Sequence, residues 1–146
     1  MFKELLNRLL EPAPAQLDDE GARLALTALL VRIARSDHNY SEVEKDRIDR
    51  ILTARFGLDT GGALILREQA EAMEAEAPDT VRFTRAIKDA VAYKDRTGVI
   101  EALWQVALAD GRRDANEDAL LRLSSSLLGV SDVDSAKARK RAEAAK

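Results

Sequence analysis

Residues 34–44 read ARSDHNYSEVE, and residues 107–117 read ALADGRRDANE. Each stretch contains an aspartate and, seven residues later, a glutamate. These acidic residues are Asp37, Glu44, Asp110 and Glu117. Both acidic positions recur at one constant offset of 73 residues, and each pair separates two apolar helix patterns. The sequence therefore predicts a helix–acidic turn–helix unit that occurs twice in the chain.

The first acidic turn lies between two predicted helices. The segment Leu17–Arg35 carries a long apolar pattern, with acidic residues at its start, where the helix dipole favours negative charge. After the turn, Ser41-Glu42-Val43-Glu44 has the form of a capping box, which satisfies free N–H groups at a helix start. We expect the helix that follows to end at Gly57, since glycine readily adopts the positive φ of a helix C-terminus.

The second acidic turn has similar surroundings. A break near Tyr93-Lys94-Asp95 precedes an apolar helix pattern over residues 99–108. After the turn, Asp114-Ala115-Asn116-Glu117 is another helix start of the capping-box kind, and Gly129 ends the predicted helix. The two units therefore share their order of helix, acidic turn and capped helix.

Further helices are predicted outside these units. Asp59 to about Ala77 forms one, and Asp79 caps a shorter one. Met1–Glu11 has an amphipathic pattern with the apolar stripe Phe2, Leu5, Leu6, Leu9 and Leu10. Eleven residues are marginal as an isolated helix in water, so this segment needs a surface. That surface is its own domain, a second copy, a membrane or another partner.

The C-terminal stretch, residues 131–146, is rich in alanine and in basic residues. The basic residues are Lys137, Arg139, Lys140, Arg141 and Lys146. Because its apolar residues are small and few, we expect a solvated terminal helix that frays. The alternative is that its charges bind phosphates on lipid or nucleic acid.

The composition favours a single all-α domain. The chain has 146 residues, of which 46% are hydrophobic and 34% charged, as is typical of globular proteins. Aromatic residues make up 4%, so the core must consist mainly of aliphatic side chains. No segment of convincing length alternates with the period of a strand. We expect a compact domain of about seven helices built from two related helix–acidic turn–helix halves.

Composition and charge also restrict the class of function. A net charge of −3 gives no general attraction to nucleic acid, so no nucleic-acid partner is expected. The sequence has no cysteine, which excludes disulfides, thiolate metal sites and cysteine nucleophiles. No apolar run approaches the ~20 residues of a membrane span, and Glu4 does not fit a secretion signal. A cytoplasmic location is the resulting expectation.

The four turn carboxylates allow two interpretations. In the first, each glutamate belongs to a capping box and each aspartate to a turn, and no ligand is needed. In the second, the two turns meet around a pseudo-twofold axis and a cation compensates their converging charges. Capping does not explain the aspartate that precedes the cap in both copies, so the duplication favours a shared site. Oxygen ligands alone select Ca²⁺, Mg²⁺ or Mn²⁺.

Other signals of chemistry are weaker. His38 is the sole histidine and could add a nitrogen ligand beside Asp37, although an exposed turn histidine is the simpler interpretation. The run Ser124-Ser125-Ser126 has no neighbouring base that would activate a hydroxyl. Trp104 lies in an aliphatic helix pattern and is expected in the core. No catalytic residue and no organic cofactor site are predicted.

Parts of the chain resemble the TerB-like tellurite-resistance family. These parts are residues 29–37 with Glu44, the segment Arg82-Phe83-Thr84-Arg85, and residues 101–111 with Glu117. The resemblance spans about Leu17 to Arg141 and is most specific in the second half. It implies a compact helical fold of two related halves and a metal site made by both turns. Carried over, the metal ligands are Asp37, Glu44, Asp110 and Glu117. Two positions depart from the family pattern. His38 replaces the glycine that is usual after the first aspartate, and Arg113 occupies a position in the second turn that is commonly aliphatic.

These observations give one leading hypothesis and two alternatives. We divide the chain into an amphipathic N-terminal segment, 1–14, and a TerB-like helical domain with a basic tail, 15–146. The leading hypothesis is a non-enzymatic module that binds a divalent cation and contacts protein partners in a stress-related setting. The first alternative is a metal-independent adaptor at the membrane periphery, using the N-terminal stripe and the C-terminal tail. The second, less favoured, is a metal-dependent hydrolase.

Overall fold

The computed structural model describes residues 20–36, 38–77, 79–109 and 115–144. Within these residues the chain forms seven α-helices and no strand, so the prediction of an all-α fold is confirmed. The helices are α2 (Glu20–Arg35), α3 (Glu42–Phe56), α4 (Thr60–Glu76), α5 (Val81–Ala90), α6 (Tyr93–Ala107), α7 (Ala115–Leu127) and α8 (Asp132–Ala144). None of these described helices is both long and apolar enough to cross a membrane.

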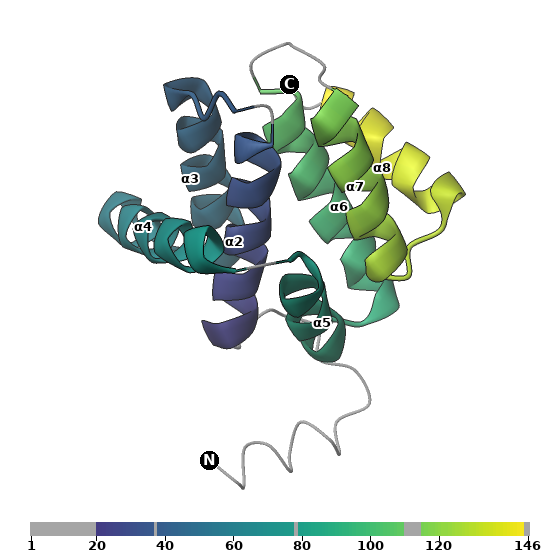
Figure 1. Ribbon diagram of the computed structural model, residues 1–146, viewed down its shortest axis with the longest axis horizontal. Helices are drawn as coiled ribbons and strands as arrows, with labels where there is room; N and C mark the ends of the chain where they lie inside the picture. The colour runs from purple at the N-terminus through teal and green to yellow at the C-terminus, as the bar shows by residue number, and fades with distance from the viewer. Residues whose placement is uncertain (1–19, 37, 78, 110–114, 145–146) are drawn as a thin grey trace, which may run out of the picture.

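Helix α2 is the central element of the fold. It packs against α3, α4, α5, α6 and α7, and Figure 1 shows it between α3 and α6. Ten of its sixteen residues are buried. Because neighbours surround α2 on several sides, its sequence is apolar over much of its circumference, as expected of a buried helix.

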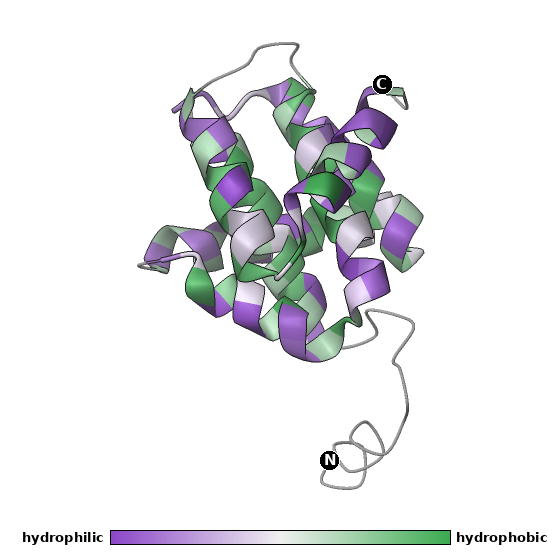
Figure 2. Cartoon of the chain, turned by 90° about the vertical axis from the view of Figure 1, so that its right-hand side faces the viewer, coloured by the Kyte–Doolittle hydropathy of each residue, from purple (hydrophilic) through white to green (hydrophobic). Residues whose placement is uncertain are grey.

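The core is mainly aliphatic, as the low aromatic content predicts. Its fully buried side chains include Leu26, Leu29, Ile48, Phe83 and Leu103. Figure 2 shows hydrophobic and hydrophilic residues alternating along the helices, as expected of helices that each cover part of a shared core. Trp104 is also buried, which confirms its predicted place.

Local signals predicted several helix ends correctly. Ser41 is the N-cap of α3, and its side chain and that of Glu44 form both bonds of the capping box. Gly57 ends α3 with φ of 67°, and Gly129 follows α7 with φ of 73°. Both glycines adopt the left-handed conformation that a Cβ disfavours, which explains why these helices stop there.

Two predicted helix starts differ from the structure. Helix α6 begins at Tyr93, so no break falls there; the chain is extended at Val91 and Ala92 instead. The Arg96 side chain donates to the carbonyl of Val91, a contact that helps to define this connection. At α5 the N-cap is Thr80 and not Asp79, although Asp79 Oδ1 still accepts a bond from the N–H of Val81 at 3.1 Å.

Most residues of the C-terminal helix α8 are exposed, in agreement with the prediction of a solvated helix, but the helix is also docked on the fold. Helix α8 packs along α6, and its residues Ala138 and Ala142 are buried. Arg141 Nε donates to Glu101 Oε1 of α6 at 2.6 Å. Small side chains allow close approach of two helices, so the few apolar residues of α8 suffice for docking.

The described helix ends are spaced regularly along the chain. Helices α2 and α3 end at residues 35 and 56, and α4 begins at residue 60; α6 and α7 end at residues 107 and 127, and α8 begins at residue 132. The ends of α2 and α6 are thus 72 residues apart, the ends of α3 and α7 are 71 apart, and the starts of α4 and α8 are 72 apart. The helices thus form two groups of three, α2–α4 and α6–α8. In each group the third helix packs against the first, α4 against α2 and α8 against α6. Helix spacing therefore closely follows the offset of the acidic residues.

Candidate cation site at the acidic turns

The helix ends that flank the two acidic stretches lie at one end of the molecule. Figure 1 shows there the C-terminal ends of α2 and α6 and the N-terminal ends of α3 and α7. Helix α2 packs against both α6 and α7, and α3 packs against α6. Of the four predicted ligands, Asp37 and Asp110 lie outside the described residues. The other two predicted ligands, Glu44 and Glu117, belong to the described residues.

Glu44 lies in the first turn of α3 and is fully buried, with an exposed fraction of 0%. Its Oε1 accepts bonds from the backbone N–H of Ser41 at 3.0 Å and from the Ser41 hydroxyl at 3.2 Å. In return, the N–H of Glu44 donates to Ser41 Oγ at 3.3 Å. The two bonds that Ser41 donates to the carboxylate both go to Oε1, and the second oxygen, Oε2, is buried as well.

Glu117 occupies the equivalent position in the first turn of α7. Its exposed fraction is 2%, and its Oε2 is also buried. The expected cap residue, Asp114, lies outside the described residues, so the second capping box stays a prediction. Glutamate is among the residue types that are least often buried. The structure therefore places a buried carboxylate at the start of both α3 and α7.

The described residues alone do not form a complete metal centre. Within them, no group of three or more histidine, aspartate or glutamate side chains is arranged to hold a metal ion. That finding does not cover Asp37 or Asp110. The four-carboxylate site consequently remains a prediction, to which the described residues contribute two buried glutamates.

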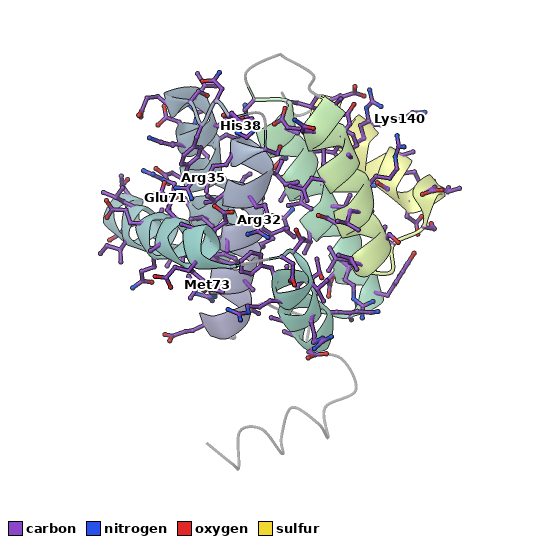
Figure 3. The ribbon with its side chains drawn as sticks, in the orientation of Figure 1. Arg32, Arg35, His38, Glu71, Met73 and Lys140 are labelled. Atoms are coloured by element: carbon purple, nitrogen blue, oxygen red, sulfur yellow. The ribbon has the colours of Figure 1, made fainter. Side chains whose placement is uncertain are left out.

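The segment around the first acidic turn is attached to α4 on both sides. Before the turn, Arg35 donates to Glu74 Oε1 at 2.6 Å and to the carbonyl of Glu71 at 3.2 Å. After it, the Tyr40 hydroxyl donates to Glu71 Oε2 at 2.6 Å. Figure 3 shows Arg35 and Glu71 close together between α2 and α4. Two acidic residues one helical turn apart thus hold both flanks of this turn.

Electrostatics strengthen this attachment. Burial raises the pKa of Glu71, but hydrogen bonds from Tyr40 and Arg67, with the charges of Arg67 and Arg35, outweigh it and lower that pKa below its ordinary value. Burial, followed by the hydrogen bond to Glu71, raises the pKa of Tyr40. At neutral pH a neutral phenol therefore donates to an ionised carboxylate, a strong type of hydrogen bond.

Sequence reasoning missed this α4 contact. Arg67 joins the cluster by donating to Glu71 Oε2 at 2.8 Å and to Asp49 Oδ1 of α3 at 2.7 Å. The only local signal is the spacing of Arg67 and Glu71, four residues apart on α4. Such pairs are common on solvated helix faces, so the spacing did not indicate a link to the acidic turn.

His38 lies at the same end of the molecule, as Figure 3 shows. Its side chain is exposed, which confirms the simpler of its two interpretations. Its φ of 63° lies in the left-handed region, where residues other than glycine are uncommon. The backbone geometry therefore explains why a glycine suits this position.

The comparison with protein families covers both turns. A family model described as "Tellurite resistance protein TerB" matches residues 23–140. The chain belongs to the TerB family. The TerB match begins within α2 and ends within α8, so it includes every described helix in whole or in part. Searches of curated proteins and of solved structures gave no match.

Proposed function

We propose that this TerB domain binds a divalent cation, Ca²⁺, Mg²⁺ or Mn²⁺, through Asp37, Glu44, Asp110 and Glu117. The observation that carries the proposal is the burial of Glu44 and Glu117 at equivalent positions. An ionised carboxylate loses its hydration on burial, and positive charge or hydrogen bonds must offset that loss. A cation between the turns supplies such charge to both carboxylates at once.

Helix packing supports the idea of two related halves. A twofold relation requires that a contact between the first helix of one half and the second helix of the other occurs in both directions. Helix α2 packs against α7, and α6 packs against α3. The helix offsets of 72, 71 and 72 residues support the same relation.

The donor set and the attachment to α4 also fit a cation. Carboxylate oxygens are the preferred ligands of hard ions such as Ca²⁺, Mg²⁺ and Mn²⁺. Arg35 and Tyr40 tie the flanks of the first turn to α4. A turn that is already held in place loses less conformational freedom when it binds a ligand, which favours affinity.

Calorimetric titration of chelator-treated protein with each ion separately tests the proposal. We expect binding heat and a rise in the thermal midpoint for at least one ion, because a ligand of the folded state stabilises it. Glu44→Gln preserves a capping side chain but removes the charge, and should weaken binding roughly tenfold or more. Glu42→Gln is the matched control, since that side chain is 83% exposed. If the wild type at millimolar ion gives no binding heat and no thermal stabilisation, cation binding is refuted.

We further propose a binding role, and not a catalytic one, in contact with protein partners under stress. The description of the matching family as a tellurite resistance protein supports the stress setting. Expression in a tellurite-sensitive bacterium tests it: the wild type should improve growth on tellurite, and Glu44→Gln should do so less. Equal growth with the wild type and with an empty vector would contradict this part.

The structure weakens the alternative of a membrane adaptor. That alternative uses the basic side chains of the tail, but Arg141 pairs with Glu101 and the Arg139 guanidinium lies 5.1 Å from the centre of the Trp104 ring. Fewer charges of α8 are therefore available for phosphates. The hydrolase alternative needs a substrate cleft beside the ion, and no observation on the described residues favours it.

A further inference from the structure

A groove runs between the beginning of α2 and the first half of α4. Its volume is about 510 Å³. Among the residues that line it are Glu20, Gly21, Leu24, Leu58, Ile65 and Leu66. Ile65 is 58% exposed, and the adjacent Leu64 is exposed as well. The described part of the chain thus leaves aliphatic side chains of α4 open to solvent beside a concave surface.

We propose that the N-terminal stripe of the same chain, Phe2, Leu5, Leu6, Leu9 and Leu10, binds in this groove. The spacing of the stripe predicts one apolar helix face that needs a surface. Aliphatic side chains, Ile65 among them, line the groove. Binding of the stripe there buries the apolar surface of both the stripe and Ile65, which is favourable.

Chain connectivity favours the chain's own stripe over a second copy. Glu20 and Gly21 line the groove and are the first described residues of α2. Nine residues, 11–19, join the stripe to them and span at most about 30 Å when extended. A short tether of this kind raises the local concentration of the stripe to roughly the millimolar range. A second copy at micromolar concentration cannot match that value.

The groove is independent of the proposed cation site. It lies at the N-terminal end of α2, whereas the acidic turns lie beyond the C-terminal ends of α2 and α6. A helix of sixteen residues separates these ends by about 24 Å. Binding of the stripe therefore requires no ion, and its failure leaves the cation proposal intact.

Cysteine cross-linking of the full chain tests the occupant directly. The natural sequence has no cysteine, so introduced pairs react without background. With a short bismaleimide, the pairs Leu6→Cys with Ile65→Cys and Leu9→Cys with Ile65→Cys should give an internally linked monomer. The control pair is Leu9→Cys with Leu123→Cys, because Leu123 is 49% exposed on α7. Yields equal to the control, or a cross-linked dimer as the main product, would overturn the proposal.

Hydrogen exchange supplies a second test without cross-linking. Amides of residues 2–10 should exchange at least tenfold more slowly than in an unstructured peptide, and Ile65→Lys should remove this protection. Val133→Lys should leave it unchanged, since Val133 is exposed on α8 and does not line the groove. Unprotected amides in the wild type would overturn the proposal. Co-sedimentation of the wild type, but not of Leu5→Lys/Leu9→Lys, with phosphatidylcholine–phosphatidylserine vesicles would also overturn it, in favour of a membrane.

Discussion

At the scale of single residues, short-range chemistry and long-range packing meet beside the first acidic turn. The bond between Ser41 and Glu44 spans three residues and follows from the capping pattern in the sequence. The bond between Tyr40 and Glu71 spans 31 residues and follows only from the docking of α4. Full burial of Glu44 is likewise a product of packing, because the cap pattern itself is compatible with an exposed carboxylate.

The backbone of His38 leads to a stability prediction. A left-handed conformation costs roughly 1–2 kcal/mol for residues with a Cβ, whereas glycine adopts it readily. His38→Gly should therefore raise the free energy of unfolding by about 0.5–1 kcal/mol, as measured by urea denaturation. His38→Ala keeps the Cβ and should give no such gain. Equal stabilities of the glycine and alanine variants would show that φ is not the cause.

The lowered pKa of Glu71 predicts a pH dependence. A carboxylate whose pKa is lower in the folded state than its ordinary 4.5 stabilises the fold above that value, and the contribution is lost as the pH falls through the folded pKa. Glu71→Gln should reduce the free energy of unfolding at pH 7 by roughly 1.5–3 kcal/mol, as for a hydrogen bond to a charged group. Urea denaturation at pH 7 and pH 3 measures this difference, which should shrink at pH 3. The exposed Glu76→Gln is the control, and a difference independent of pH would contradict the assigned role.

At the scale of helices, the local sequence pattern predicted which helices occur better than it predicted where each helix begins and how it packs. The start of α3 and the ends of α3 and α7 agree with the sequence because capping groups and glycine act within a few residues. The start of α6 and the docking of α8 did not follow from local pattern. Both involve contacts with distant residues, because Arg96 of α6 donates to the carbonyl of Leu128, 32 positions away, and Arg141 of α8 donates to Glu101, 40 positions away.

The contact between α8 and α6 can be tested by a single enlarged side chain. Ala138 is fully buried, so Ala138→Leu should overpack the helix pair and lower the free energy of unfolding by about 1–3 kcal/mol. Ala136→Leu, at an exposed position of the same helix, should change it little. Urea denaturation measures both. Equal effects would mean that α8 is not packed against α6 in solution.

At the scale of the whole molecule, the arrangement of helices brings the flanks of both acidic turns to one end (Figure 1). A site shared by the two turns predicts one ion per chain in calorimetry. Glu44→Gln and Glu117→Gln should then each weaken the same binding event, and the double variant should bind the ion more weakly than either single variant. Two ions per chain, with one lost in each single variant, would indicate separate sites and contradict a shared one.

The sequence by itself determined the helical class, most helix limits, the family and the repeated acidic pattern. These properties depend on apolar periodicity, caps and glycines, whose effects act between residues close in the chain. Tertiary structure alone decided the docking of α8, the attachment of the first turn to α4, the burial of Glu44 and Glu117, and the groove beside Ile65. Each of these joins residues far apart in sequence, and their meeting depends on how all the helices pack around α2.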